Sequence, residues 1–256
     1  MQHRPRKRFG QHFLHDPRII GRIIAAIAPK PGQHLVEIGP GLGAITLPLL
    51  EQAKSLTAVE LDRDVIPHLE SAARDKGELR IVQGDALEVA LAPLAAGGKI
   101  RLVGNLPYNV STPLLFHFLD QADCVQDMHF MLQKEVVQRM AAKPGGKEYG
   151  RLTVMLASRC KVEPLFNIGP GAFRPPPKVD SAFVRLTPYA SPPFPIHDRS
   201  RYAQIVTQAF SHRRKTLKNA VAGLLDEAAI VAAGIDPTTR PETLSAADFA
   251  RLSNGS

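Results

Sequence analysis

The sequence has few of the residues that would crosslink a chain or hold a metal ion. It contains two cysteines, Cys124 and Cys160, and no tryptophan. Two cysteines supply neither a disulfide framework nor a four-ligand metal site, so we expect two buried, reduced thiols of a cytosolic protein. The nine histidines form no HExxH motif and no Cys/His cluster. We therefore expect no bound metal.

Long apolar runs are also lacking. None approaches the roughly 20 residues that cross a bilayer, and the basic N-terminus has no apolar signal-peptide region. A hydrophobic content of 44% over 256 residues is nevertheless enough for a sizeable core. That length suits one large α/β domain, alone or with a small appendage.

Acidic residues are fewer than basic residues, which gives a formal net charge of +8. The excess lies near the N-terminus and in "SHRRKTLKN" at 211–219. Solvated charged faces are one interpretation, but two separate basic clusters favour a polyanionic partner, namely nucleic acid. Apolar residues around the second cluster recur at helical spacing and predict an inward face: Val206, Phe210, Leu217, Val221 and Leu224. The predicted RNA-binding residues are Arg4, Arg6, Lys7, Arg8, Arg213, Arg214, Lys215 and Lys218.

Short apolar runs alternate with segments of helical periodicity. Predicted strands cover 34–39, 55–62, 79–85, 99–105, 124–133, 150–168 and 180–188, and predicted helices cover 43–53, 63–76 and 134–143. Such alternation indicates a doubly wound, mostly parallel sheet. The three prolines of "RPPPK" at 174–178 exclude a helix or a strand ladder there and predict an extended connector.

A proline-rich linker at 189–198 marks a change in composition. Beyond it the pattern is purely helical, over 201–210, 216–225, 226–234 and 245–252. We therefore predict two domains, with residues 1–189 forming the α/β domain and residues 190–256 a small helical one.

The glycines of "VEIGPGLGAIT" fall between a predicted strand and a predicted helix. Gly39, Gly41 and Gly43 would let the backbone turn sharply and approach a ligand closely. The pattern also fits the nicotinamide dinucleotide fingerprint or a purely structural turn, so the glycines alone do not identify a cofactor.

Acidic residues follow the next two predicted strands. Glu60 in "AVELD" could accept hydrogen bonds from both hydroxyls of a ribose, and Asp85 in "QGDAL" could accept one from an adenine amine. Each could equally be a helix N-cap. In open α/β sheets, however, ligands bind at the carboxyl ends of the strands, where these residues lie.

The tetrapeptide "NLPY" ends the fourth predicted strand. The side-chain carbonyl of Asn105 and a backbone carbonyl beside Pro107 could each accept an N–H from an exocyclic adenine amine. This would aim the nitrogen lone pair at an electrophilic methyl group while Tyr108 stacks on the base. Nicotinamide hydride transfer has no comparable use for this tetrapeptide. A plain strand-end turn is the alternative.

Nine segments occur along the chain in an order that resembles a known family: "FGQHFL", "VEIGPGLG", "ELD", "GDAL", "GNLPYN", "LQKEV", "YGRL", "FRPPPKVDSA" and "RRKTLKN". Over residues 4–250 the chain resembles the ribosomal RNA adenine N6,N6-dimethyltransferases, specifically the bacterial KsgA (RsmA) type. The pair "NLPY" and "FRPPPKVDS" is highly specific, whereas the glycine motif is not. Only six residues precede "KRFGQHFL", too few for a transit peptide, so the mitochondrial relatives fit poorly.

The resemblance implies a Rossmann-like methyltransferase fold, with a doubly wound, mostly parallel seven-stranded sheet and a small C-terminal all-helical domain. It implies S-adenosyl-L-methionine (SAM) as cofactor. The matching cofactor-binding positions are His12, Leu14, Gly39, Gly41, Glu60, Asp85, Ala86 and Asn105. The positions matching the target-adenine site are Asn105, Leu106, Pro107, Tyr108 and Phe173, the last covering the other face of the base. His12 replaces the family's usual Asn, which changes the shape of that contact and makes it titratable.

The implied activity is dimethylation of two adjacent adenosines in the 3′-terminal hairpin of 16S rRNA, within the 30S subunit or its precursor. We expect a cytoplasmic monomer with a role in ribosome biogenesis. A 23S rRNA adenine methyltransferase of the same family is the first alternative. A ribosome-assembly factor that acts by binding and a nicotinamide oxidoreductase are the others.

Overall fold

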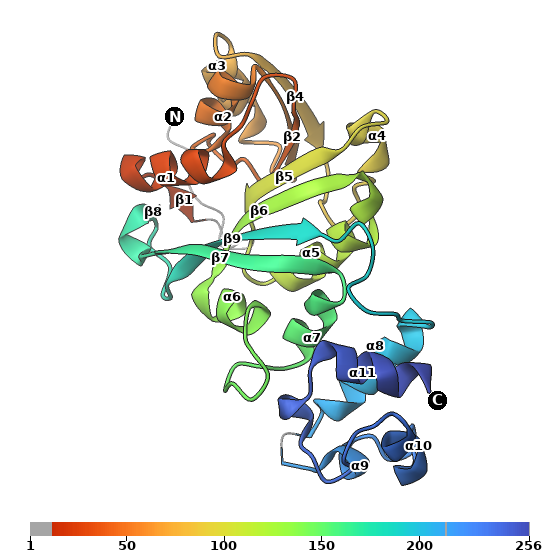
Figure 1. The fold of residues 1–256 in the computed structure, drawn as a ribbon. Coiled ribbons are helices and arrows are strands. Elements are labelled where there is room, and N and C mark those ends of the chain that lie inside the picture. Colours follow the sequence, from red (N-terminus) through yellow and green to blue (C-terminus); the bar gives the residue numbers. More distant parts are fainter. Residues whose placement is uncertain (1–11, 213, 256) are drawn as a thin grey trace. The chain divides into compact units, whose positions relative to one another are not determined.

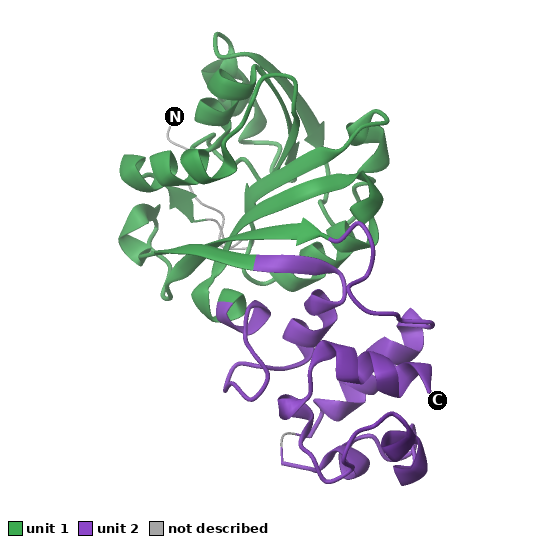
Figure 2. Cartoon of the chain, viewed as in Figure 1, with its two compact units in different colours: residues 1–137, 163–188 green, residues 138–162, 189–256 purple. Residues whose placement is uncertain are grey.

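The computed structural model describes residues 12–212 and 214–255. The chain forms two compact units, shown in Figure 2: unit 1 comprises residues 1–137 and 163–188, and unit 2 comprises residues 138–162 and 189–256. The sequence predicts one boundary, after residue 189. The structure adds residues 138–162 to the helical unit, because Tyr149 and Val154 pack into the core of that unit.

Unit 1 is built on a seven-stranded sheet with the order β4-β3-β2-β5-β6-β9-β7 (Figure 1). Strands β2 to β6 are parallel, and β9 pairs with β6 in the antiparallel direction. The strands are β2 (His34–Ile38), β3 (Ser55–Glu60), β4 (Glu78–Gln83), β5 (Ile100–Asn105), β6 (Val125–Gln133), β7 (Cys160–Ile168) and β9 (Ser181–Pro188). The doubly wound, mostly parallel sheet predicted from the sequence is confirmed.

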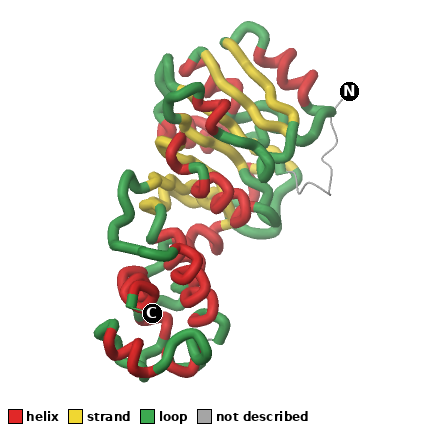
Figure 3. The backbone as a smooth tube through the Cα atoms, turned by 90° about the vertical axis from the view of Figure 1, so that its right-hand side faces the viewer, coloured by secondary structure: helices red, strands yellow, loops and turns green. Residues whose placement is uncertain are grey.

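Helices cover both faces of this sheet. Successive residues of a strand point to opposite faces, and two neighbouring residues of β6 pack against helices on different sides. Met131 belongs to the core cluster that contains buried residues of helices α1, α2 and α3. Phe130 points to the other face, where its ring lies 5.8 Å from that of Phe118. Figure 3 shows helices on both sides of the strands of unit 1. The helices here are α1 (Pro17–Ile27), α2 (Thr46–Ala53), α3 (Ile66–Ala73), α4 (Ala92–Ala95) and α5 (Ser111–Asp120).

Two parts of the element prediction need correction. Residues 151–157 were predicted as part of a strand but form α7 (Arg151–Ala157). A short apolar run fits a buried helix as well as a strand, and Val154 is fully buried in the unit 2 core. Helix α1 is absent from the prediction, although Asp16 caps it by accepting hydrogen bonds from the N–H groups of Arg18 and Ile19.

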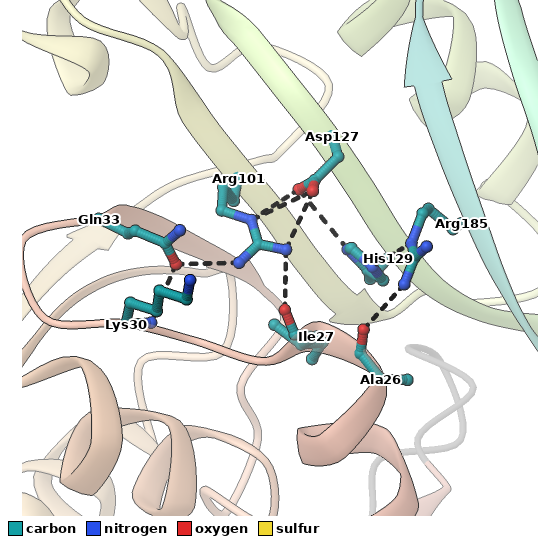
Figure 4. Close-up of polar contacts among 8 residues, drawn as sticks. All are labelled: Ala26, Ile27, Lys30, Gln33, Arg101, Asp127, His129 and Arg185. Atoms are coloured by element: carbon teal, nitrogen blue, oxygen red, sulfur yellow. Dashed lines mark hydrogen bonds and ion pairs between the residues drawn. The ribbon is translucent and has the colours of Figure 1, made fainter.

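The carboxyl end of α1 is held by a buried polar network, drawn in Figure 4. Arg101 donates to both carboxylate oxygens of Asp127 and, at 2.8 Å, to the carbonyl of Ile27. Arg185 donates to Nε2 of His129 at 2.9 Å and to the carbonyl of Ala26 at 3.0 Å. These two arginines satisfy carbonyls that a helix end leaves without intrahelical partners. The network therefore attaches α1 to strands β5, β6 and β9.

Unit 2 is helical around a core that includes Tyr202, Ile205, Leu217 and Phe249. Its helices are α7, α8 (Arg199–Ala209), α9 (Leu217–Ala220), α10 (Glu227–Ala232) and α11 (Ala246–Asn254), while α6 (Lys134–Met140) spans the boundary between the units. The predicted inward-facing residues are all buried or partly buried in this core: Val206, Phe210, Leu217, Val221 and Leu224. Residues 216–225 are helical only over α9, so Arg214 and Lys215 lie in the connection between α8 and α9, whereas Lys218 lies within α9.

The described residues also form short 3-10 helices at η2 (Ala122–Cys124), η3 (Pro170–Ala172) and η4 (Pro241–Thr243), and a two-stranded sheet of β1 (Phe13–Leu14) and β8 (Phe173–Arg174). Both cysteines are free thiols, and Cys160 is buried as expected, whereas Cys124 is only partly buried. Across the part of the chain that the structure describes, no helix combines the length and apolar character of a membrane span.

Candidate functional site

A cavity of about 1000 Å³ opens at the carboxyl ends of the parallel strands of unit 1. Its lining comes from the ends of β2, β3 and β5, from the segments that follow β2, β3, β4 and β5, from the chain just before α1, and from Arg174 and Pro175. Parallel strands bring these segments to one edge of the sheet, although they are far apart in sequence. The predicted cofactor residues all line this cavity: His12, Leu14, Gly39, Gly41, Glu60, Asp85, Ala86 and Asn105.

The glycine loop after β2 uses the conformational freedom of its glycines. Gly39 has φ +66° and Gly41 has φ +53°, a region that side chains with a Cβ rarely occupy. A Cβ at Gly41 would also lie only 3.1 Å from a ring carbon of Phe13. Any larger residue at Gly41 would therefore be strained and would require a small shift of the Phe13 ring.

Glu60 ends β3 with its side chain almost fully buried. One carboxylate oxygen accepts the N–H of Asp62 at 2.8 Å, and the other accepts the N–H of Gly41 at 3.2 Å. Each carboxylate oxygen has two lone pairs, so both can accept a further hydrogen bond. Burial raises the pKa of Glu60, while the two backbone donors oppose that shift. The carboxylate thus links the glycine loop to β3 and still has acceptor sites available.

Asp85 follows β4 and faces the same cavity together with Ala86. Its Oδ1 accepts the N–H of Leu87 at 2.9 Å, which is the local capping role that such an acid often has. Oδ2 accepts no hydrogen bond from any described residue. Capping by one oxygen and ligand binding by the other are therefore compatible.

Glu37 is a cavity-lining acid that the sequence analysis does not identify. It lies on β2 and is 2% exposed. Its Oε2 has no hydrogen-bond partner among the described residues, and burial raises its pKa to about 8. The only sequence signal for it is one carboxyl group within an apolar strand.

Asn105 ends β5 and is oriented by the chain before α1. Its amide nitrogen Nδ2 donates to the backbone carbonyl of His12 at 3.1 Å. A carbonyl can only accept, so this contact fixes which side of the amide is nitrogen. The Oδ1 of Asn105 is left as an acceptor in a residue that lines the cavity.

Tyr108 lies on the same side of the cavity, and its hydroxyl is 2.6 Å from Oγ of the fully buried Ser181. Burial raises the pKa of Tyr108. The rings of Tyr108 and His12 are nearly parallel, at 27°, with centroids 6.0 Å apart. His12 is held in turn by a 2.7 Å hydrogen bond from Nδ1 to the carbonyl of Pro175. Because the acceptor is a carbonyl, Nδ1 carries the hydrogen.

The target-adenine positions separate into two groups in the structure. Asn105, Leu106, Pro107 and Tyr108 all line the cavity. Phe173 does not, because its ring is 2% exposed and belongs to the core cluster of unit 1. It lies on the short strand β8 (Phe173–Arg174), so its neighbour Arg174 faces the opposite side, toward the cavity. We therefore do not assign the Phe173 ring to a face of the base.

The predicted RNA-binding residues are only partly described. Arg4, Arg6, Lys7, Arg8 and Arg213 lie outside the described residues. Arg214 and Lys215 are exposed on unit 2. Lys218 is half-buried, and its Nζ lies 3.3 Å from a carboxylate oxygen of Glu227. Among the described residues of this cluster, Arg214 and Lys215 are thus the more accessible cations.

The structure adds residues that sequence reasoning missed. Besides Glu37, the cavity is lined by Phe13, Leu61, Asn109 and Arg174. Phe13 and Arg174 lie within the motifs quoted above, but the direction in which each side chain points could not be predicted from the sequence. Within residues 12–212 and 214–255, no group of three His, Cys, Asp or Glu residues could hold a metal ion.

The chain is similar to known proteins over almost its full length. The family model described as ribosomal RNA adenine dimethylase matches residues 2–255. The chain is 56% identical over 254 residues to ribosomal RNA small subunit methyltransferase A of Pseudomonas putida, covering 99% of this chain and 95% of the relative. It is 57% identical over 249 residues to the protein of the same name from Xanthomonas campestris, covering 97% and 95%.

Solved structures agree with this. A dimethyladenosine transferase from Plasmodium falciparum superimposes with a TM-score of 0.78 at 26% identity, covering 94% of this chain and 96% of the other. The 23S rRNA methyltransferase ErmE superimposes with a TM-score of 0.73 at 25% identity, covering 95% and 98%.

Proposed function

The chain belongs to the ribosomal RNA adenine dimethylase family, and from this premise we propose that it dimethylates two adjacent adenosines in the 3′-terminal hairpin of small-subunit rRNA. Membership makes it a SAM-dependent methyltransferase that forms dimethyladenine in rRNA. The observation that carries the proposal is Asn105, whose amide is oriented by His12 so that Oδ1 is available at the cavity.

The cavity fits the cofactor. Glu60 has acceptor sites for ribose hydroxyls, and Oδ2 of Asp85 can accept from an adenine amine. The glycine loop lets the backbone come close to the cofactor that these acids would bind. When bound, SAM supplies a methyl group on a sulfonium, which is electrophilic without further activation.

We propose that the residues after β5 position the target amine. The adenine N6 is a poor nucleophile because its lone pair is delocalised into the ring. Oδ1 of Asn105 accepts one N–H, and the carbonyl of Leu106, which accepts from no described residue, accepts the other. Both contacts draw N6 toward tetrahedral geometry and direct its lone pair at the methyl carbon. Since Tyr108 lines the same part of the cavity, its ring is available to stack on the base.

Formation of the N–C bond breaks the S–C bond, and the amine then loses a proton. No strong base is needed, because the sulfonium leaving group drives the transfer and the proton can leave late. A second round of the same chemistry gives the dimethylated amine.

Two relationships favour small-subunit rRNA over 23S rRNA. Identity is 57% to a small-subunit methyltransferase but 25% to the 23S enzyme. The segment "FRPPPKVDS" also resembles the small-subunit type. We propose residues 1–189 as the catalytic domain and 190–256 as the rRNA-binding domain, with residues 138–162 packed into the latter's compact unit.

We also propose that the substrate is the rRNA within the 30S particle or its precursor and that the enzyme takes part in ribosome biogenesis. We propose that the enzyme acts as a monomer. We place this activity in the cytoplasm, where bacterial ribosomal particles are assembled.

Incubation with labelled SAM tests the substrate assignment. Unmethylated 30S subunits and isolated 23S rRNA are supplied separately, and the RNA nucleosides are then analysed. We expect label in dimethyladenosine from the 30S sample alone. Label in the 23S sample alone would assign the chain to the other branch of its family.

A further inference from the structure

A two-stranded ribbon forms one side of the cavity. Strand β1 (Phe13–Leu14) pairs antiparallel with β8, with Phe13 opposite Arg174 and Leu14 opposite Phe173. Residues directly opposite each other share a face of the ribbon. Phe173 belongs to the core and does not line the cavity, and Leu14 belongs to the core as well as to the lining. Phe13 and Arg174 line the cavity and are not part of that core. The pairing therefore directs Arg174 toward the cavity side and holds its backbone in place.

Arg174 stands out from the other ionisable residues around the cavity. Among the described residues that line it, Arg174 is the sole Arg or Lys, and the remaining ionisable side chains are four acids, three histidines and Tyr108. Arg174 is exposed, and no described residue pairs with its guanidinium. An unpaired arginine beside several acids keeps its five donors for a ligand that arrives from solvent.

The neighbourhood of Arg174 is the part of the cavity that we assign to the target base. The next residue, Pro175, accepts the hydrogen bond from Nδ1 of His12. The His12 ring faces Tyr108, and its backbone carbonyl orients Asn105. Arg174 therefore directly precedes Pro175 in the chain, and Pro175 binds the His12 residue that contacts both Asn105 and Tyr108. The acids proposed to hold the cofactor's ribose and adenine lie at the carboxyl ends of β3 and β4 instead.

We propose that Arg174 binds a backbone phosphate of the RNA at the target adenosine. A guanidinium fork matches a phosphate in geometry and charge, and such contacts set the position of a nucleic acid without reading its sequence. An adenine must leave its stack to enter a cavity of this kind, and a held phosphate keeps the extruded nucleotide in place. This inference rests on the proposed function, because it takes RNA as the substrate.

The test compares Arg174→Gln with Arg74→Gln in the full chain. Arg74 caps the carboxyl end of α3, is exposed and does not line the cavity, so both variants lose one positive charge. Equilibrium binding of unmethylated 30S particles is measured over a range of salt concentrations, together with the Kd for SAM and the methylation rate. Thermal unfolding of each variant confirms that it folds.

We expect Arg174→Gln to weaken particle binding roughly tenfold or more, as for a lost hydrogen bond to a charged group. The slope of log affinity against log salt should become shallower by about 0.7–0.9. Arg174→Lys should retain the salt slope and recover only part of the affinity, because it keeps the charge but loses the fork. The Kd for SAM should match that of the wild type, and Arg74→Gln should change neither quantity.

Two results would overturn the inference. Arg174→Gln could bind the particle like Arg74→Gln, or it could weaken SAM binding alone, which would assign the guanidinium to the cofactor's carboxylate. The wild-type enzyme serves as a separate check. If it methylates no small-subunit rRNA, the proposed function fails, whereas the binding comparison still decides the role of Arg174.

Discussion

The amide nitrogen of Asn105 donates a hydrogen bond to the backbone carbonyl of His12, with 3.1 Å between the two atoms. This contact joins the end of β5 to the segment before α1, across more than ninety positions of sequence. It determines which atom of the amide is free at the cavity, and that atom is the acceptor Oδ1. A side chain fixed in this way is preorganised to hold an amine.

The first prediction concerns His12, at a position where the family resemblance implies Asn. Its backbone carbonyl orients Asn105, and any residue supplies that carbonyl. An Asn side chain can also replace Nδ1 as the donor to Pro175. His12→Asn should therefore keep turnover on 30S subunits close to the wild-type rate. His12→Ala, which removes the donor, should cost about 0.5–1.5 kcal/mol of unfolding free energy. A large loss of turnover in His12→Asn would show that the ring itself takes part.

The second prediction concerns Glu60. Glu60→Ala removes the acceptor for the ribose hydroxyls and also the partner of the Gly41 N–H. Loss of a hydrogen bond to a charged group costs about 1.5–3 kcal/mol, so the Kd for SAM should rise by roughly 10-fold to 150-fold. Calorimetric titration with SAM measures this directly.

Glu51→Gln is the matched control for Glu60. It also removes one acid, but Glu51 is exposed, pairs with Lys76 and does not line the cavity. The control should bind SAM like the wild type. Equal affinity in Glu60→Ala and Glu51→Gln would mean that the cofactor lies elsewhere.

The third prediction concerns the basic cluster of unit 2. Replacing Arg213, Arg214 and Lys215 with Ala should weaken binding to the pre-30S particle and flatten its salt dependence. Each lost phosphate contact should make the log–log salt slope shallower by about 0.7–0.9. The affinity for SAM should not change, since every cavity-lining residue belongs to unit 1.

A control for overall charge replaces Lys143 and Lys147, which are exposed elsewhere on unit 2, together with the exposed Arg199. If both triple variants lose the same affinity, only the net charge matters. If the cluster variant keeps both its affinity and its salt slope, the cluster is a solvated face and "RPRKR" becomes the candidate for RNA contact.

The fourth prediction is a pH dependence of stability that arises from Glu37. Burial raises its pKa from 4.5 to about 8, so the folded state retains a proton that the unfolded state has lost. The corresponding stability is full below pH 4.5 and is lost as the pH rises through about 8. Urea unfolding should show the wild type losing more stability than Glu37→Gln between pH 6 and pH 8.

His129 acts in the opposite direction. Burial lowers its pKa from 6.5 to about 4, so its contribution is full above pH 6.5 and is lost as the pH falls through about 4. Both proteins contain His129, so its contribution cancels in the difference between wild type and Glu37→Gln. Parallel stability curves for the two proteins from pH 6 to pH 8 would contradict the role of Glu37.

Much of unit 1 could be predicted from the sequence, because its strands and turns are indicated by residues that are close together in the chain. Val36 and Ile38 belong to an apolar strand run, and the glycines after them mark a turn between strand and helix. The order of strands then places Glu60, Asp85 and Asn105 at one edge without any further information.

The remaining features depend on contacts between distant segments. Phe173 was expected at the base, but its pairing with Leu14 turns the ring into the core and leaves Arg174 at the cavity. Helix α7 was predicted as a strand, because a short apolar run has no distinguishing period and its packing partners are distant in sequence. The link between Asn105 and His12 likewise follows only from the folded arrangement.

The most direct measurement is single-turnover methylation of unmethylated 30S subunits by the wild type and by Asn105→Ala, both at saturating SAM. We expect the wild type to form N6,N6-dimethyladenosine in the small-subunit rRNA. Loss of one preorganised contact costs about 2.7–4 kcal/mol, so the variant should be slower by roughly 100-fold to 1000-fold. Its Kd for SAM should change far less than its rate. Methylation by Asn105→Ala at the wild-type rate would remove Asn105 from the mechanism and contradict the role that its contact with His12 implies.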